Sequence, residues 1–298
     1  MSEKLNAATA SIGVNLSMLL LKAAVAVLTG SIGILAETLH SGLDLLASMF
    51  AYLGIKKATE PSDTTHHYGH HKFENASSLL QGALLALTAI FVIYEAINRL
   101  LHPAPIESLG AGLAVMLVSM VVAIVTSRYL HEVSMREGSS ALEADATHFT
   151  SDVLGSVAVL AGLGMAAAGF PQGDSLAAIL VGLIMLYMSY DISSRAACVL
   201  LDMAPDRRVI EAIEKSIRKS PEVTSFHKLK ARYSGNRLFV DVHLRFDPAK
   251  SIDETHALGH RVKVQIIEDS PIVEEVNIHV EPEPTLGGYT QEDKSRKA

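Results

Sequence analysis

Two stretches of the sequence decide the fold: residues 37–48 read ETLHSGLDLLAS, and residues 145–156 read DATHFTSDVLGS. Both fit the pattern [Glu/Asp]-x-x-His-x-x-x-Asp-x-x-x-Ser, and both lie within long apolar segments. In each stretch a His and an Asp stand four residues apart, which places them on one face of a helix. A charged side chain at the centre of a bilayer costs a few kcal/mol or more. The repeated pattern therefore predicts a functional pair of membrane helices.

Composition divides the 298 residues into two parts around these stretches. Residues 1–201 hold 9 Lys and Arg with 15 Asp and Glu, whereas the shorter segment 202–298 holds 16 and 17. The first part resembles a membrane protein and the second a soluble domain, which excludes a wholly soluble enzyme and a disordered or fibrous chain. The net charge of −7, with no basic surplus, argues against nucleic acid as a partner. The single cysteine, Cys198, excludes a disulfide framework and a multi-cysteine metal site.

Six apolar segments are long enough to cross a bilayer as helices. They are residues 8–29, 32–55, 78–98, 109–127, 140–169 and 175–194. The short polar N-terminus lacks a cleavable signal pattern, so the first segment is predicted to be retained. Lys and Arg gather in the loops on the side of both termini, while the other side carries only Arg99. The positive-inside rule therefore predicts that both termini are cytoplasmic.

The polar C-terminal part has the pattern of a small α/β domain. Helical spacing and strand alternation follow the order αββαβ, over residues 206–219, 224–233, 238–246, 252–268 and 273–281. The predicted fold class is thus a membrane α-helical protein, with six transmembrane helices followed by a cytoplasmic α/β domain. The predicted domains are 1–204 and 205–284, and residues 285–298 are expected to be a disordered tail.

The second and fifth spans are three crossings apart, so they run in opposite directions. If their polar faces meet, four side chains converge: His40, Asp44, His148 and Asp152. Two imidazole nitrogens and two carboxylate oxygens form a tetrahedral shell that suits Zn²⁺. Glu37 and Asp145, one turn earlier, fit a vestibule and the head-group region equally well. Ser48 and Ser156 are less informative, because small polar residues are common where membrane helices pack.

Two further groups of histidines lie outside the spans. The loop after the second span contains Asp63, His66, His67, His70 and His71, a metal-binding composition. The C-terminal part contains His227, His243, His256, His260, His279 and Glu281. His279 and Glu281 share one face of a strand, and from spacing alone a metal site and ordinary surface histidines are equal alternatives. Three groups favour metal handling, and no zinc-protease, ATP-binding or aspartyl-phosphate motif points to an enzyme.

Several motifs in this order resemble those of the cation diffusion facilitator family, which comprises zinc and related divalent-metal/proton antiporters. The motifs are Leu28-Thr29-Gly30-Ser31, the stretch LAETLHSGLD at 35–44, His66-x-Tyr-Gly-His70-x-Lys72-x-Glu74, and His148-x-x-x-Asp152. The resemblance covers roughly residues 8–284. It implies six spans, a metallochaperone-like cytoplasmic domain, a homodimer and proton-coupled export of metal from the cytoplasm.

The resemblance also implies a role for individual residues. The transport site maps to His40, Asp44, His148 and Asp152, the loop site to Asp63, His66 and His70, and the tail sites to His227, His243, His256, His279 and Glu281. His67, His71 and His260 have no role in the family pattern. Many bacterial members carry Asp at the position of His40, and histidine there is typical of strongly zinc-selective relatives.

The sequence therefore predicts a homodimeric, multi-pass protein of the cell inner (plasma) membrane that exchanges cytoplasmic Zn²⁺ for protons. Zn²⁺ is the transported substrate and also a structural or regulatory ligand of the tail. The expected partners are membrane lipid, divalent metal ions, protons and a second copy of the chain. Two alternatives stay open: an exporter of Mn²⁺, Fe²⁺ or Cd²⁺, and a membrane-anchored zinc sensor. Mn²⁺ and Fe²⁺ would favour carboxylates and amides over His40 and His148, and a sensor needs ligands only in its tail.

Overall fold

The computed structural model describes residues 3–29, 32–101, 109–167, 170 and 172–284. The chain forms two compact units, Met1–Leu201 and Asp202–Ala298. Residues 285–298, expected to be a disordered tail, lie outside the described residues.

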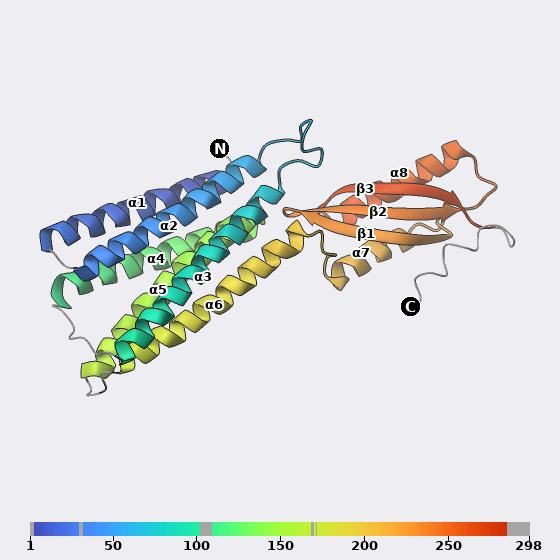
Figure 1. Ribbon diagram of the computed structural model, residues 1–298. Helices are drawn as coiled ribbons and strands as arrows, with labels where there is room; N and C mark the ends of the chain where they lie inside the picture. The colour runs from blue at the N-terminus through green and yellow to red at the C-terminus, as the bar shows by residue number, and fades with distance from the viewer. Residues whose placement is uncertain (1–2, 30–31, 102–108, 168–169, 171, 285–298) are drawn as a thin grey trace. The chain divides into compact units, whose positions relative to one another are not determined.

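The first unit is a bundle of helices (Figure 1). Its elements are α1 (Glu3–Thr29), α2 (Ile32–Ala58), α3 (Lys72–Leu101), α4 (Leu109–Glu137), α5 (Ser140–Ala167) and α6 (Gly173–Leu200). The six expected helices are confirmed. Helices α3, α4 and α6 extend beyond the apolar segments that predicted them, because polar residues at their ends continue the helical backbone.

Apolar length distinguishes the helices from one another. Within the described residues, four helical segments are long and apolar enough to cross a membrane: Glu3–Leu28, Lys72–Leu101, Ala114–Glu137 and Gly173–Leu200. Helices α2 and α5 are not among them, although each has the length of a span. These are the two helices that carry the repeated His and Asp pattern.

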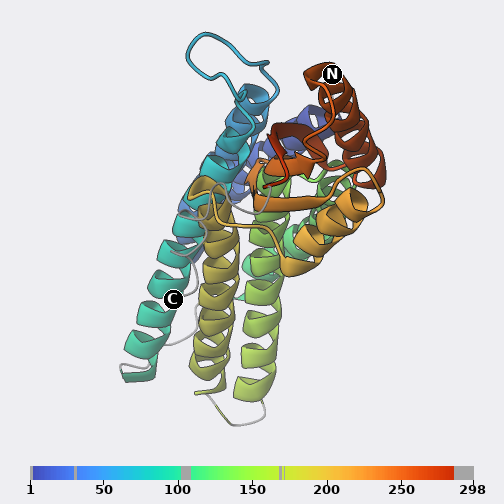
Figure 2. The ribbon, with the colours of Figure 1, turned by 90° about the vertical axis from the view of Figure 1, so that its right-hand side faces the viewer.

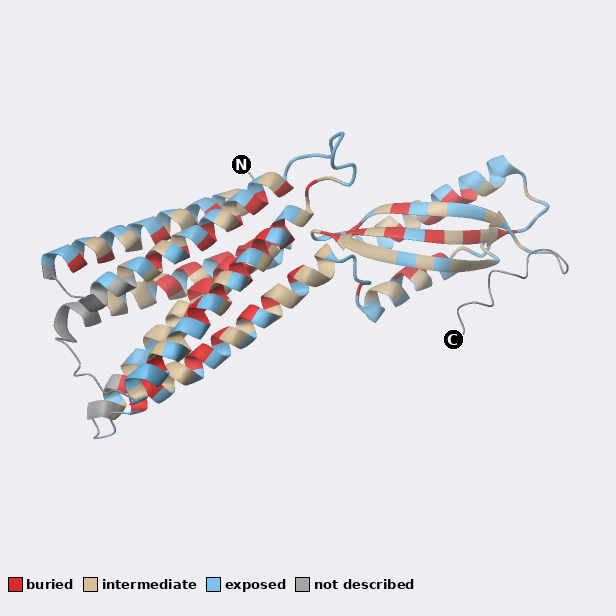
Figure 3. Ribbon diagram, viewed as in Figure 1, coloured by how far each residue is buried: buried red, intermediate tan, exposed pale blue. Residues whose placement is uncertain are grey.

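Neighbouring helices of the bundle pack in pairs: α1 on α2, α4 on α5, and α3 on α6. The pairing of α3 with α6 is visible from two directions (Figures 1 and 2). Small residues dominate the buried positions, including Ala7, Ala51 and Ala89, while large apolar residues such as Phe91 and Tyr187 are exposed. Buried and exposed positions alternate along the helices (Figure 3). Small residues inside and large apolar residues outside suit helices that pack closely in lipid.

The second unit has the expected order αββαβ. Its elements are α7 (Arg207–Arg218), β1 (Ser225–Ser234), β2 (Arg237–Phe246), α8 (Ile252–Asp269) and β3 (Val273–Pro282). The sheet order is β1-β2-β3, with β1 and β2 antiparallel and β2 and β3 parallel. Asp206 caps α7, and Ser251 with Glu254 forms a capping box at the start of α8.

The sheet of this unit has one apolar and one polar face. Along β2, Val242 and Leu244 are buried and pack in a core with Ile213 of α7 and Val262 of α8. Residues at odd positions of the strand, among them His243, point to the other face because side chains alternate along a strand. The two helices therefore cover one face, as expected, and leave the opposite face to polar residues.

Candidate metal centres

The repeated pattern on α2 and α5 forms a polar cluster inside the bundle. The Nε2 atom of His40 lies 3.7 Å from Oδ1 of Asp44 and 3.8 Å from Oδ1 of Asp152. One candidate ligand atom from each of these three residues lies within 4.8 Å of the others. Because Asp152 belongs to α5 and the other two residues to α2, the cluster joins the two helices.

His148 reaches this cluster through Asp44. Its Nε2 atom lies 2.8 Å from Oδ1 of Asp44, and both side chains are buried. The opposite ring atom, Nδ1, has no hydrogen-bond partner among the described residues. The structure therefore brings all four predicted midplane residues together, with His148 hydrogen-bonded to Asp44 instead of pointing at a common centre.

Helix α1 supports the cluster in a way that the sequence pattern did not reveal. The Nδ2 atom of Asn15 donates to the Asp44 carbonyl oxygen at 3.2 Å and to Oγ of Ser48 at 2.8 Å. Ser11 lies one turn earlier, and its hydroxyl meets that of Ser48 at 2.7 Å. Ser11, Asn15 and the buried Lys22 recur on one face of α1 at helical spacing, and this polar stripe within an apolar span was the available signal.

Asp145 has a defined place in the structure. Its side chain is fully buried among the helices. Oδ1 of Asp145 accepts a hydrogen bond from Ser48 at 2.8 Å. The side chain of Glu37 lies outside the described part of the chain, and Ser156 bonds its own helix through the Asp152 carbonyl.

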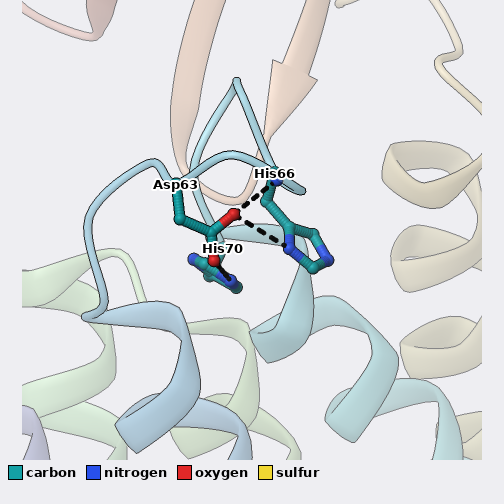
Figure 4. Close-up of side chains that lie close together, drawn as sticks. All are labelled: Asp63, His66 and His70. Carbon is teal, nitrogen blue, oxygen red and sulfur yellow. Dashed lines mark hydrogen bonds and ion pairs between the residues drawn. The ribbon is translucent and has the colours of Figure 1, made fainter.

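The loop between α2 and α3 gathers Asp63, His66 and His70, each with one candidate ligand atom within 4.8 Å of the others (Figure 4). Gly69 makes this possible, because its φ of 77° lets the chain turn back and its N–H bonds the His66 carbonyl at 3.0 Å. Nδ1 of His70 lies 3.1 Å from the Pro61 carbonyl, which can only accept. Nδ1 therefore carries the hydrogen, and Nε2, 3.5 Å from Asp63, keeps its lone pair for a metal.

The electrostatics of the loop favour an ionised carboxylate. Hydrogen bonds from the Thr65 hydroxyl and from the backbone N–H groups of His66 and Thr65 hold the pKa of Asp63 far below its usual range. His67 is exposed and His71 half-buried, and neither belongs to the three-residue cluster.

In the second unit, three histidines line up across the polar face of the sheet. His243 is the register partner of His227 on β1 and of His279 on β3. Glu281 connects them: its carboxylate lies 2.7 Å from His243, 3.4 Å from His227 and 3.6 Å from His279. Strand register, which spacing within one strand does not provide, brings these four predicted residues together.

The surroundings of this tail cluster favour the metal-binding forms of Glu281 and His227. Burial alone would raise the pKa of Glu281, but the hydrogen bonds from His243 and Arg245 and the charge of His227 hold it below its usual range. Burial and the charge of Arg245 lower the pKa of His227. An ionised carboxylate and a neutral imidazole are the forms that bind metal.

Two other histidines of this unit stay apart from the cluster. His256 and His260 are both exposed on α8, the helix that covers the opposite face of the sheet. His256, which the resemblance implied as a tail ligand, therefore does not join the four residues on the strands within one chain.

A helical membrane bundle with buried His and Asp at its centre, followed by a small α/β domain with a metal-binding composition, defines a multi-pass transporter of metal ions. Family comparison agrees. Residues 8–201 match the cation efflux transmembrane domain, and residues 205–283 match the cytoplasmic domain of cation efflux proteins. The chain belongs to this family, the cation diffusion facilitators, and is a divalent-cation efflux transporter with a cytoplasmic C-terminal domain, not an enzyme.

Curated relatives match along nearly the whole chain. The cation-efflux pump FieF of Shewanella oneidensis is 29% identical over 93% of this chain and 95% of its own length. That of Salmonella arizonae is 30% identical over 93% and 92%. An uncharacterized transporter of Methanocaldococcus jannaschii is 32% identical over 90% and 94%. Among solved structures, the metal-bound C-terminal domain of the CzcD transporter from Thermotoga maritima is 24% identical over 28% of this chain and 93% of that chain, with a TM-score of 0.26.

Proposed function

We propose that this transporter exports Zn²⁺ from the cytoplasm in exchange for protons. The observation that carries the proposal is the cluster of His40, Asp44, His148 and Asp152, contributed by two antiparallel helices. Two nitrogens and two carboxylate oxygens match the ligand types and the coordination number of Zn²⁺. Ligands at the middle of the bundle serve transport, whereas a zinc sensor needs ligands only in its cytoplasmic domain.

Proton exchange follows from the chemistry of the same residues. Histidine binds metal only in its neutral form, and an ordinary His loses its proton near pH 6.5. A hydrogen bond joins Nε2 of His148 to Oδ1 of Asp44, and these are the two atoms that would coordinate an ion. A metal ion must displace the hydrogen between them, so the two cations compete for one place.

The remaining predicted features complete the proposal. Residues 1–204 act as the transport domain, and 205–284 as a metal-binding dimerisation domain in which Zn²⁺ bridges two copies. The protein is a homodimer of the inner (plasma) membrane. Asp63, His66 and His70 form a second, cytoplasmic zinc site, whose ionised Asp63 supports cation binding.

Transport by the reconstituted protein tests this function. Proteoliposomes are loaded with an ion-sensitive dye, and initial uptake of Zn²⁺, Cd²⁺, Fe²⁺ and Mn²⁺ is compared with and without a pH gradient. We expect Zn²⁺ to be taken up fastest and the gradient to accelerate it. Preference for Mn²⁺ or Fe²⁺ would transfer the proposal to those metals, and uptake that ignores the pH gradient would contradict the exchange of protons.

A further inference from the structure

The carboxyl group of Asp145 is buried next to the transport site but belongs to none of the predicted metal centres. The residue has no exposed surface. Oδ1 accepts one hydrogen bond, from the Ser48 hydroxyl at 2.8 Å, whereas Oδ2 has no hydrogen-bond partner among the described residues. A buried polar atom without a partner is rare in native proteins and points to a bound species or a functional role.

The hydrogen bonds of the neighbouring polar groups do not reach Oδ2. Ser48 donates to Oδ1 of Asp145, and in the 2.7 Å contact between the Ser11 and Ser48 hydroxyls either one can be the donor. Ser11 is also a hydrogen-bonding neighbour of the Asp145 carboxyl group. The two hydrogens of the Asn15 amide go to Ser48 and to the carbonyl of Asp44. These hydrogen bonds join α1, α2 and α5 beside the carboxyl group and leave Oδ2 of Asp145 without a donor.

The charged groups around Asp145 come from three helices. His148 and Asp152 follow it on α5, and both interact electrostatically with its carboxyl group. Helix α2 contributes Asp44, one turn from Ser48, and α1 contributes the buried Lys22, whose charge acts on Asp44. Within the described residues, Asp145 forms no ion pair. A buried carboxylate that has only hydroxyl partners, no ion pair and one oxygen without a donor is costly, whereas the neutral acid carries its own hydrogen on Oδ2.

Asp145 lies one helical turn to the cytoplasmic side of His148. The C-terminal domain is cytoplasmic, so α6 ends and α5 begins on that side. A divalent ion that arrives at His148 brings two positive charges close to this carboxyl group, and opposite charge at short range favours the ionised form. Binding of the metal thus opposes binding of a proton one turn away.

We propose that Asp145 is a proton-binding site of the transport cycle. When the transport site is empty, Oδ2 holds a proton. When a divalent cation binds, the Oδ2–H bond breaks, the proton leaves to water, and the carboxylate keeps its hydrogen bond from Ser48. After the cation departs, the carboxylate takes up a proton again. This inference rests on the proposed exchange of metal for protons and adds a proton carrier that is not a metal ligand.

The experiment measures proton release when Zn²⁺ binds to the full-length protein in weakly buffered detergent solution. Each chain is compared with the same chain carrying Asp152→Ala in addition. The difference in proton release belongs to the transport site, because the loop and tail sites contribute equally to both. Asp145→Asn should lower the release at the transport site by about one proton per ion, as linkage requires. Glu143→Gln is the matched control, because Glu143 lies on the same helix but is paired with Arg195 at 2.7 Å, and its release should equal that of the wild type.

Infrared difference spectra test the same proposal without relying on the Asn variant. The wild type should lose a band of a protonated carboxyl group when Zn²⁺ binds, and Ser48→Ala should shift this band upward because Oδ1 loses its donor. No loss of such a band in the wild type would overturn the proposal, as would equal proton release by Asp145→Asn and wild type. If the wild type released no protons at the transport site, the proposed function itself would fail.

Discussion

His40 is the midplane ligand whose chemistry bears most directly on metal choice. Its Nε2 atom faces carboxylate oxygens of both Asp44 and Asp152, at 3.7 and 3.8 Å. Its side chain is 32% exposed, against 4% for His148, so the surroundings restrict it less. The residue at position 40 therefore decides whether the four-residue site offers a metal ion two nitrogen ligands or one.

We predict that His40→Asp keeps transport but lowers the ratio of Zn²⁺ to Cd²⁺ uptake several-fold. Three carboxylates can bind through one or two oxygens each, so the shell expands and accepts the larger Cd²⁺ more readily. The added negative charge is costly in the bilayer and is offset in part by the bound ion. Initial uptake of each ion into proteoliposomes at equal protein measures the ratio.

The control for this variant is Asp152→Ala, which should abolish uptake of both ions because it removes a ligand from α5. An unchanged ratio in His40→Asp would place metal selection elsewhere, most directly in the packing around the site.

At the scale of elements, the close approach of α3 and α6 depends on glycine. A Cβ added at Gly182 of α6 would overlap the side chain of Ile93 on α3 and lie 3.4 Å from the Ala89 carbonyl oxygen. Gly13 on α1 has nothing within 4 Å of the same position. Glycine therefore allows the close helix contact at position 182, whereas no neighbour requires a glycine at position 13.

Substitution of these two glycines by alanine should change stability in opposite directions. Gly182→Ala forces Ile93 or the helices to move, and overpacking of this kind typically costs about 1–3 kcal/mol. Gly13→Ala adds helix propensity without a clash and should raise stability by up to about 1 kcal/mol. Thermal unfolding in detergent compares both with the wild type. A Gly182→Ala variant as stable as Gly13→Ala would show that α3 and α6 can separate without cost.

Some contacts between elements could be predicted from the sequence, and others could not. The repeat on α2 and α5 was sufficient to predict that His40 meets Asp152, because few structures justify that pattern twice in a membrane. The partners of Asn15 and Ser48 could not be predicted, although both residues stand in polar patterns, since small polar residues are common in membrane helices and only packing decides which faces meet. The distance of His256 from the strand cluster likewise depends on how α8 lies on the sheet.

At the scale of the whole molecule, each unit has a core of its own. The cytoplasmic unit packs residues of α7, α8 and all three strands into one apolar cluster. The change in charge density near residue 201 predicted this division, because a membrane span excludes charge and a soluble surface requires it. An isolated fragment 205–298 is therefore expected to fold and to report on the tail alone.

In such a fragment, Zn²⁺ should stabilise the dimer through the row of His227, His243, His279 and Glu281. A ligand that binds only the dimer adds about 2.7 kcal/mol at 100 times its Kd, which lowers the dissociation constant about 100-fold for each such site. The double variant His243→Ala with His279→Ala should lose most of this gain and keep its fold, because both side chains lie on the polar face of the sheet and not in the core.

His260→Ala, on the exposed side of α8, is the matched control and should dimerise like the wild type. Sedimentation with Zn²⁺ and with chelator measures the difference, and circular dichroism checks the fold. A wild-type fragment that dimerises equally well in chelator would mean that apolar or polar contacts, not metal, hold the two tails together.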